Sequence, residues 1–160
     1  MGGGSRSGKT RYSLEYARRC PPPRIYLATA ETLDGEMRAR AAAHQAERGT
    51  DFTTIEEPLD LTGALPEGPC TIVLDCLTLW TSNLLLANRD IRSESTRFFE
   101  AAAQHPGTLI LVTNEVGCGI VPENELARRF RDEAGWLNQQ AAAAATEVWW
   151  LVFGCPLRVK

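Results

Sequence analysis

The sequence predicts an α/β fold in which a mostly parallel sheet is covered by helices on both faces. Three observations lead to this fold: short apolar runs, helix-like stretches between them, and a glycine-rich loop near the first residue. The 160 residues are enough for one domain of ordinary size with a substantial core, so we expect a single domain over residues 1–160.

Four apolar runs rich in β-branched residues have the composition of buried strands. They do not alternate between apolar and polar positions, which is typical of strands covered on both faces. The predicted strands are Arg24 to Thr29, Cys70 to Asp75, Thr108 to Asn114 and Glu147 to Phe153.

Helix-like stretches separate these runs, and strands that alternate with helices favour a parallel sheet. The first stretch ends before the helix-breaking Pro21-Pro22-Pro23. In the last, apolar residues recur at three- and four-residue steps on one face: Leu126, Phe130, Ala134, Leu137 and Ala141. The predicted helices are Lys9 to Arg19, Gly35 to Arg48 with Asp34 as its cap, Leu77 to Ala87, and Glu123 to Ala145.

Composition excludes several classes of function. The net charge of -3 gives no broad basic surface, so we expect no nucleic-acid partner. No apolar run approaches membrane-spanning length and no segment resembles a signal peptide, so we expect no membrane partner. Five scattered cysteines without a CxxC pair suit reduced thiols. The expected class is a cytoplasmic enzyme.

The loop before the first helix matches the phosphate-binding pattern G-x-x-x-x-G-K-[ST] in full. Its residues are Gly3, Gly4, Ser5, Arg6, Ser7, Gly8, Lys9 and Thr10. In such a loop, backbone N–H groups close around phosphate oxygens at a helix N-terminus. Lys9 is expected to reach the terminal phosphates and Thr10 to bind Mg²⁺. The alternative is a chance match in a Gly/Ser-rich tail. The pattern favours a P-loop NTPase.

A phosphate-binding loop normally follows a buried strand, yet only Met1 and Gly2 precede Gly3. We therefore expect the first strand of the sheet to be missing, through a mis-assigned start codon or a trimmed chain. An added apolar strand is expected to raise stability.

Asp75 ends the apolar run Thr71-Ile72-Val73-Leu74. An acid at the carboxyl end of such a strand is placed to organise Mg²⁺ beside the P-loop. The alternative role is a cap for the helix that begins at Leu77.

His44 lies in the helix predicted from Gly35. Arg40, His44 and Arg48 fall along one stripe of it, so two guanidinium groups would hold phosphate oxygens while the imidazole attacks or moves a proton. Taken alone, this pattern favours the alternative of an exposed histidine on a charged helix. His105 is predicted to lie in a turn before a strand.

The segment from Asn114 to Asn124 follows a predicted strand and leads into a long helix. Loops at the carboxyl ends of parallel strands form the ligand-binding edge. Asn114 and Glu115 are therefore predicted to face the same crevice as the P-loop, the alternative being a structural connection.

Together these motifs resemble one family, the bifunctional adenosylcobinamide kinase / adenosylcobinamide-phosphate guanylyltransferases of cobalamin biosynthesis. The likeness covers Gly3 to Lys160. It rests on the P-loop, Tyr26-Leu27-Ala28-Thr29-Ala30, Glu36-Met37-Arg38-Ala39-Arg40 with His44 eight residues past Glu36, Thr113-Asn114-Glu115-Val116-Gly117 through Pro122-Glu123-Asn124, and the tail Gly154-Cys155-Pro156-Leu157-Arg158-Val159-Lys160.

The resemblance implies two reactions and a RecA-like P-loop fold. Adenosylcobinamide is phosphorylated by a nucleoside triphosphate, GTP or ATP, and GMP then passes from GTP to adenosylcobinamide phosphate through a guanylylated histidine. His44 matches that nucleophile, and Arg40 and Arg48 would neutralise phosphoryl charge. Further positions implied at the nucleotide site are Thr29, Ala30, Glu31, Glu47, Arg48, Glu56 and Asp75. The family also implies a homotrimer.

The sequence leaves two alternative functions open. One is a P-loop phosphotransferase with another acceptor, in which His44 is not a nucleophile. The other is a nucleotide-binding module or remnant without turnover.

Overall fold

A computed structural model describes residues 1–30 and 49–160. The predicted helix from Gly35 to Arg48, with Asp34 as its cap, lies outside these ranges. The strands are β1 (Gly2–Gly3), β2 (Arg24–Ala28), β3 (Thr53–Glu56), β4 (Thr71–Asp75), β5 (Thr108–Val112), β6 (Trp149–Val152) and β7 (Cys155–Arg158). The helices are α1 (Lys9–Arg18), α3 (Leu77–Leu86), α4 (Ile91–Gln104) and α5 (Glu125–Ala144).

The strands form two ladders that β1 connects. One has the order β3-β2-β4-β5 with every pair parallel, and the other has β1-β6-β7 with β1 parallel to β6 and β7 antiparallel to it. On its second edge, β1 continues the pattern toward β5: Thr113 N–H donates to the Met1 carbonyl at 3.0 Å, and Glu115 N–H donates to the Gly3 carbonyl at 3.1 Å. A short strand therefore does lead into the P-loop, between β5 and β6.

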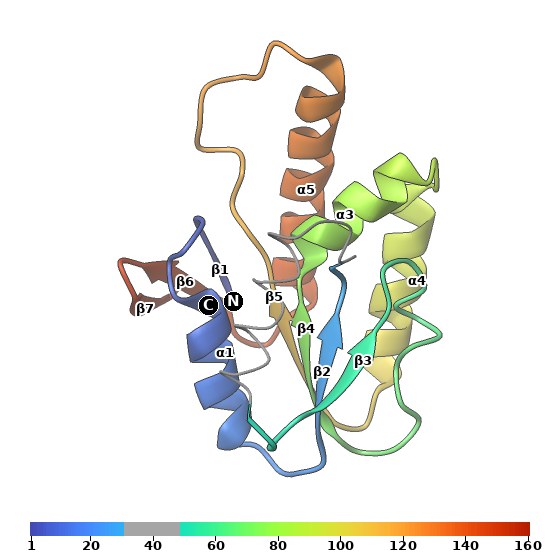
Figure 1. The fold of residues 1–160 in the computed structure, drawn as a ribbon, viewed down its shortest axis with the longest axis vertical. Helices are drawn as coiled ribbons and strands as arrows, with labels where there is room; N and C mark the ends of the chain where they lie inside the picture. The colour runs from blue at the N-terminus through green and yellow to red at the C-terminus, as the bar shows by residue number, and fades with distance from the viewer. Residues whose placement is uncertain (31–48) are drawn as a thin grey trace.

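Helices cover both faces of the sheet, as predicted. Helix α1 packs on one face, while α3, α4 and α5 pack together on the other (Figure 1). Strand β4 serves both layers because its side chains alternate: Val73 lies in the core beneath α1, and Ile72 and Leu74 lie in the core beneath the other three helices. The prediction of an α/β fold with helices on both faces is confirmed.

The predicted elements and the observed ones differ at a few places. The four predicted strands, and the three predicted helices that fall within the described residues, are present with ends shifted by at most two residues. Strand β3 and helix α4 were not predicted by residue range. Strand β7 was not predicted, since Gly154 and Pro156 give its segment the composition of a loop. On α5, Leu126 is 50% exposed although it shares the stripe with the buried Leu137, because the first turns of the helix extend beyond the sheet (Figure 1).

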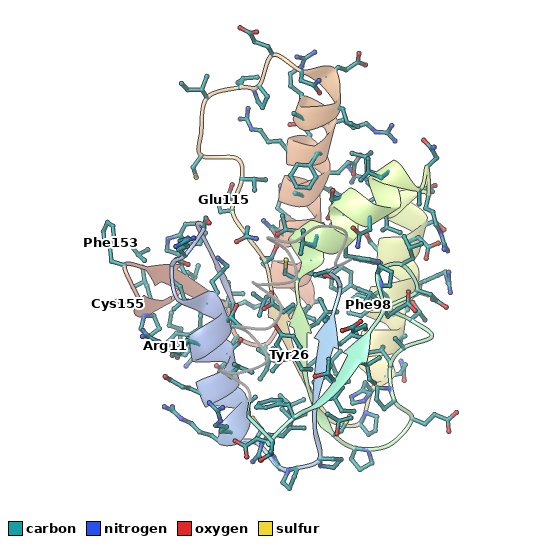
Figure 2. The ribbon with its side chains drawn as sticks, in the orientation of Figure 1. Arg11, Tyr26, Phe98, Glu115, Phe153 and Cys155 are labelled. Carbon is teal, nitrogen blue, oxygen red and sulfur yellow. The ribbon has the colours of Figure 1, made fainter. Side chains whose placement is uncertain are left out.

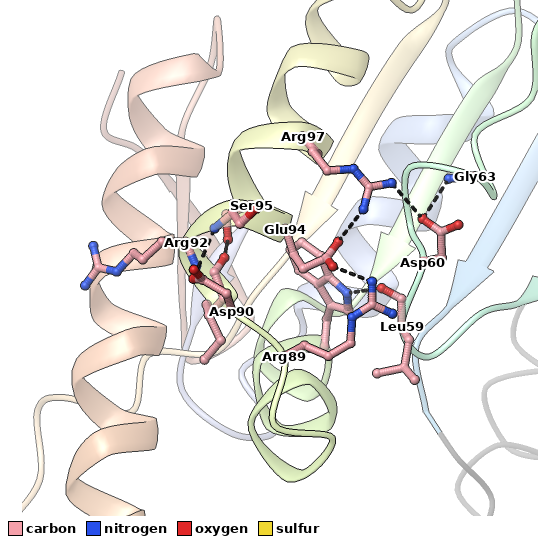
Figure 3. A network of polar contacts seen from close by, with 12 residues as sticks. Leu59, Asp60, Gly63, Arg89, Asp90, Arg92, Glu94, Ser95 and Arg97 are labelled. Carbon is pink, nitrogen blue, oxygen red and sulfur yellow. Dashed lines mark hydrogen bonds and ion pairs between the residues drawn. The ribbon is translucent and has the colours of Figure 1, made fainter.

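The corner between α3 and α4 is fixed by a polar network at the surface (Figure 3). Asp90 caps α4 by accepting hydrogen bonds from Arg92 N–H and Ser93 N–H at 2.9 and 3.2 Å. The carboxylate of Glu94 is paired with Arg89 and, at 2.9 Å, with Arg97. These contacts position two helices far from the P-loop, and we assign the network a structural role.

Among the helices that the structure describes, none combines the length and the apolar content needed to cross a membrane.

Candidate active site

The P-loop needs glycine at two of its positions. Gly3 has φ +149°, and a Cβ there would lie 2.5 Å from the Leu151 carbonyl oxygen. Gly8 has φ +92° and is the N-cap of α1. Both conformations are unfavourable for L side chains, so the glycines allow the backbone to curl tightly at the N-terminal end of the helix. Curled backbone at a helix N-terminus is an anion site.

Lys9 is held inside this loop. Its side chain is 7% exposed, and Nζ donates to the Gly4 carbonyl at 2.6 Å and to Ser7 Oγ at 3.4 Å. Burial lowers the pKa of the ammonium group, while the nearby Cys76 and Asp75 raise it. The loop therefore holds a poorly hydrated amine between its own Gly4 carbonyl and Ser7 hydroxyl, close to where the terminal phosphates of a nucleotide bind in P-loops.

Asp75 joins the P-loop to the sheet. Thr10 Oγ1 donates to its Oδ2 at 3.0 Å, and the hydroxyl of Tyr26 donates to the same oxygen at 2.5 Å. Tyr26 comes from β2, the strand beside β4. Three elements thus meet at one carboxylate oxygen: the loop helix α1, β2 and the end of β4. The cap role considered for Asp75 belongs instead to Cys76, the N-cap residue of α3.

Thr10 and Asp75 offer the oxygen donors that Mg²⁺ prefers. Magnesium keeps several waters and usually takes only one or two protein ligands in addition to substrate phosphates. A hydroxyl and a carboxylate 3.0 Å apart at the mouth of a phosphate loop fit that requirement. Within residues 1–30 and 49–160, no group of three or more His, Cys, Asp or Glu side chains could hold a metal by itself.

Thr29 and Cys76 form a reciprocal pair behind Asp75. Cys76 N–H donates to Thr29 Oγ1, which itself donates to the Cys76 carbonyl, both at 2.8 Å. Thr29 is fully buried, so its hydroxyl fixes the turn after β4 and is not turned toward the loop. Burial raises the pKa of the Cys76 thiol to about 12, so it stays protonated at neutral pH and is unsuited to nucleophilic attack.

Glu56 and Ala30 lie farther along the same edge. In the strand register, Glu56 of β3 and Asp75 of β4 both pair with Ala28 of β2, so the two acids stand on opposite sides of one strand. Two strand spacings separate their backbones by roughly 10 Å. Glu56 is exposed, and Ala30 follows β2 with its side chain half-buried.

Asn114 and Glu115 reach the loop from the end of β5. Asn114 N–H donates to Thr78 Oγ1 at 2.7 Å, and Asn138 Nδ2 donates to the Asn114 carbonyl at 3.2 Å. The backbone of Glu115 bonds Gly3 at the start of the P-loop, while its carboxylate accepts from Gly117 N–H. The structure therefore brings this segment beside the loop, as the crevice hypothesis requires.

The turn between β6 and β7 closes the other side of the P-loop. Gly154 N–H donates to the Ser7 carbonyl at 3.1 Å, and a Cβ on Gly8 would lie 3.3 Å from Gly154 Cα. The P-loop thus lies between this turn and the end of β4 (Figure 1). This contact could not be predicted from the sequence, because 147 residues separate the two backbone groups along the chain.

Five predicted site residues lie outside the described ranges. They are Glu31, Arg40, His44, Glu47 and Arg48. Their roles remain predictions from the sequence and the resemblance.

A cavity of about 420 Å³ lies among β5, β1, β6 and the C-terminal ends of α4 and α5, and it reaches the edge of this site at Gly3 and Glu115. Its walls include Leu109, Leu111, Val148 and several alanines of α5. Met1 stands at its edge and donates from its amino group to the Leu111 carbonyl at 2.8 Å. We call this space the inter-strand cavity. It contains none of Lys9, Thr10 and Asp75.

Comparison with known proteins decides the family. A family model described as cobinamide kinase / cobinamide phosphate guanyltransferase matches residues 1–159. The chain belongs to this family. It is 44% identical to a bifunctional adenosylcobalamin biosynthesis protein CobP of Pseudomonas aeruginosa, over 99% of this chain and 94% of the relative. It is 39% identical to the bifunctional adenosylcobalamin biosynthesis proteins CobU of Salmonella typhimurium and Escherichia coli, over 99% of this chain and 97% of each relative.

Membership confirms that the chain is a kinase and guanylyltransferase of cobalamin biosynthesis. It also identifies the P-loop fold as that of the cobinamide kinase / cobinamide phosphate guanyltransferase family.

Tyr26 is a partner of Asp75 that was not predicted from the sequence. The run Arg24 to Thr29 contains a tyrosine in an otherwise apolar strand, and a buried phenol needs a hydrogen-bond partner. The sequence could therefore have indicated that Tyr26 has a hydrogen-bond partner. It could not indicate that the partner is Asp75, because that depends on the order of the strands in the sheet.

Proposed function

We propose that this protein phosphorylates adenosylcobinamide and then transfers GMP from GTP to adenosylcobinamide phosphate, giving adenosylcobinamide-GDP. The observation that carries the proposal is the convergence of Lys9, Thr10 and Asp75 on one end of the P-loop. Family membership supplies the acceptor class, since the matching model names cobinamide and cobinamide phosphate.

In the kinase reaction, the hydroxyl oxygen of adenosylcobinamide attacks the γ-phosphorus of the triphosphate. The bond to the bridging oxygen breaks, the nucleoside diphosphate leaves, and the hydroxyl proton is lost to a base or to water. Lys9 is placed to neutralise the charge that builds on the terminal phosphate oxygens. Thr10 and Asp75 would hold Mg²⁺, which supplies further charge neutralisation when bound. Asn114 and Glu115 would line the acceptor side of the crevice.

In the guanylyltransfer reaction, a neutral imidazole nitrogen of His44 attacks the α-phosphorus of GTP, and pyrophosphate leaves. A phosphate oxygen of adenosylcobinamide phosphate then attacks the same phosphorus, the P–N bond breaks, and the imidazole is restored. Arg40 and Arg48, one helical turn to each side of His44 in the predicted helix, would neutralise charge on the phosphoryl oxygens. These three assignments rest on the resemblance and on side-chain chemistry.

The resemblance also supports a nucleotide site that includes the P-loop and seven further residues. These are Thr29, Ala30, Glu31, Glu47, Arg48, Glu56 and Asp75. The geometry gives Thr29 a supporting part through its pairing with Cys76. We further propose that the chain acts as a single nucleotide-binding domain in the cytoplasm and assembles as a homotrimer. The resemblance supports the trimer. Gel filtration with light scattering tests it by measuring the molar mass in solution.

The test of the histidine intermediate is incubation with GTP labelled at the α-phosphate. We expect label on the protein that is stable in base, labile in acid, and lost in His44→Ala. The chain has two histidines, so His105→Ala is the matched control and should keep the label. A folded, GTP-binding protein that takes no label, or a His44→Ala variant that keeps it, would contradict the mechanism.

A second measurement tests the acceptor. Transfer of γ-labelled phosphate to adenosylcobinamide should require Lys9 and should not require His44. Turnover of triphosphate with no phosphorylated cobinamide would show a P-loop phosphotransferase that uses another acceptor.

A further inference from the structure

Asn114 is a half-buried polar residue whose side chain the fold does not require. Its backbone is bound on both sides: the N–H donates to Thr78 Oγ1 at 2.7 Å, and the carbonyl accepts from Asn138 Nδ2 at 3.2 Å. Within residues 1–30 and 49–160, the one partner of its side-chain amide is the thiol of Cys76, 4.0 Å from Nδ2. A thiol is a weak acceptor, and this contact is long. An alanine would make the same main-chain bonds, so the structure leaves the amide donor for another partner.

The residues on either side of Asn114 are bonded to the start of the chain. Thr113 N–H donates to the Met1 carbonyl at 3.0 Å, and Glu115 N–H donates to the Gly3 carbonyl at 3.1 Å. Bonds from every second residue to one neighbour are the pattern of a strand, so the backbone stays extended beyond the end of β5. Figure 2 shows Glu115 next to the P-loop. Asn114 is therefore held in one position beside the loop.

The side chain of Asn114 lies on the face of the sheet that carries the P-loop and α1. Side chains of an extended strand alternate between faces, so Asn114 shares the face of Val112, which lies in the core beneath α1. Thr113 lies on the opposite face, where its hydroxyl donates to Asn138 of α5 at 2.6 Å. Val112 pairs with Asp75 in the strand register. Asn114 therefore lies one step beyond Asp75 on the same face.

The amide of Asn114 borders the end of the P-loop that receives the terminal phosphates. Its Nδ2 contacts Cys76, the residue that follows Asp75. Burial lowers the pKa of the Lys9 ammonium group, and the nearby Cys76 and Asp75 raise it, so that group lies near the same two residues. Lys9 and the Thr10–Asp75 pair mark where the terminal phosphates and Mg²⁺ bind. These contacts place the amide on the γ-phosphate side of the site.

A phosphate oxygen suits this donor better than a thiol does. A hydrogen bond to an ionised acceptor is shorter and stronger than one to a neutral acceptor. During phosphoryl transfer, negative charge is spread over three equatorial oxygens of the transferred group. Lys9 would approach these oxygens from the P-loop, and Asn114 from the end of β5, the strand beside β4. Donors that approach from two directions can bind different oxygens.

We propose that Asn114 is a catalytic residue of the kinase reaction, and that its Nδ2 donates to an oxygen of the γ-phosphoryl group. This inference rests on the proposed function, since it requires that the P-loop holds the triphosphate with its γ-phosphate at Lys9. The bond from the γ-phosphorus to the bridging oxygen breaks, and the bond to the acceptor oxygen forms. Asn114 keeps its own protons throughout and stabilises the charge on the oxygen that it binds.

The first experiment measures calorimetric Kd values of the Mg²⁺ complexes of α,β-methylene-GTP and α,β-methylene-GDP, without acceptor. These two ligands resist cleavage at the α-phosphorus and differ by the γ-phosphate. Asn114→Ala should raise the Kd of the triphosphate by about tenfold, the size of one lost hydrogen bond to a charged group, and that of the diphosphate by less than twofold. Asn114→Asp keeps the shape but replaces the donor with a negative charge, so it should weaken the triphosphate at least as much.

The second experiment measures transfer of γ-labelled phosphate to adenosylcobinamide. Asn114→Ala should lower kcat by about 10²-fold, as expected for one lost donor to the transition state, and should change the KM of adenosylcobinamide less than threefold. Its Tm should stay close to that of the parent protein, because the main-chain bonds of residue 114 are kept. Asn88→Asp is the matched control. Asn88 is exposed between α3 and α4, and its φ of +53° is tolerated by aspartate, so all three measurements should be unchanged.

Three results would overturn the assignment of Asn114. An equal loss of both analogues in Asn114→Ala would mean that the residue shapes the loop. Unchanged Kd and kcat values would mean that it has no part in the reaction. An unchanged Kd for the triphosphate with a raised KM for adenosylcobinamide would mean that it contacts the acceptor.

A variant of Lys9 separates this inference from the proposed function. Lys9→Ala should weaken the triphosphate analogue, and if it has no effect the P-loop proposal fails and the assignment of Asn114 fails with it. The binding experiment contains no cobinamide. A protein that phosphorylates another acceptor would therefore contradict the proposed function, while the two Kd values would still decide whether Asn114 binds the γ-phosphate.

Discussion

The two ends of the sheet differ in the residues that gather there. At the carboxyl end, Thr10 and Tyr26 donate hydrogen bonds to Asp75 at 3.0 and 2.5 Å. Lys9 donates within the P-loop, to the Gly4 carbonyl at 2.6 Å and to Ser7 Oγ at 3.4 Å. Toward the amino end lies the inter-strand cavity of about 420 Å³, with largely apolar walls. Open volume is therefore a poor guide to chemistry in this protein. Charged groups gather at the tightly curled P-loop, whereas the cavity is lined mainly by apolar side chains.

The comparison predicts that activity and stability can be changed separately. Variants at the P-loop should abolish turnover and leave the folded state intact, whereas changes at the inter-strand cavity should alter the free energy of unfolding and spare turnover.

The largest effect is expected for Lys9→Met, which removes the charge but keeps most of the side-chain volume. Kinase turnover should fall by about 10³-fold, since one charge that stabilises the transition state is lost. Stability should not fall, because burying the ammonium group already carries a desolvation cost. The measurements are γ-phosphate transfer and thermal unfolding.

Lys160 is the other lysine of the chain and provides the control. Lys160→Met should retain full turnover. A Lys9→Met enzyme that keeps more than a tenth of its kcat would remove Lys9 from the mechanism.

The next effect in size concerns Asp75. Asp75→Asn should lower kcat by about 10²-fold and raise the Mg²⁺ concentration needed for half-maximal rate, because a neutral amide is a weaker magnesium ligand. The amide oxygen still accepts hydrogen bonds from Thr10 and Tyr26, so the fold should persist.

Tyr26→Phe removes one donor to the same carboxylate and should lower kcat tenfold or less. Equal magnesium requirements in Asp75→Asn and the parent protein would argue against the metal role.

A third change addresses the inter-strand cavity. Four apolar residues, Ile-Leu-Val-Val, added before Met1 would lie between β5 and β6 and lengthen β1. We expect a gain of roughly 2–3 kcal/mol, with burial exceeding the cost of ordering the strand. For a chain of this size that corresponds to a rise in Tm of roughly 5–10 °C. A Gly-Ser-Gly-Ser extension of equal length is the matched control and should give no gain. Similar Tm values for both extensions would show that the cavity does not accept a strand.

The smallest effect concerns the amino group of Met1. Burial, with a smaller contribution from the charge of Lys9, lowers its pKa from 8.0 to about 6. Between these values the unfolded chain binds more protons than the folded one, so stability should rise as pH increases from 6 to 8. The gain should be about 1–2 kcal/mol, less than two full pKa units would give, because Met1 is partly exposed.

The measurement is urea unfolding across this pH range, on protein whose mass shows that Met1 is retained. Acetylating the amino group removes the titration, so a pH dependence of equal size in the acetylated protein would assign it to other groups.

The features that could be predicted from the sequence are those encoded by neighbouring residues. The P-loop pattern, the strand that ends at Asp75 and the stripe on α5 each lie within one short segment, and periodicity or spacing is enough to recognise them. Features that depend on pairing between distant segments were missed. The Tyr26–Asp75 bond needs the order of β2 and β4, and the Gly154–Ser7 bond needs a hairpin whose second strand begins Cys155-Pro156.

Strand β1 is a second feature that depends on distant segments and could not be predicted from the sequence. The sequence places only Met1 and Gly2 before the loop, which predicts no strand there. The structure has the two-residue β1, because β5 and β6 already present the bonding groups that Met1 and Gly3 need. A segment too short to form a strand alone becomes one when both of its neighbours exist.

That dependence has a consequence for the order of events during protein synthesis. The P-loop residues leave the ribosome well before their partners, because the β6 backbone that pairs with them and the glycine that bonds Ser7 are translated nearly 150 codons later. The loop cannot take its bonded shape on a nascent chain that ends before residue 154. Nucleotide can therefore assist only the closing stage of maturation, after the hairpin has emerged from the exit tunnel.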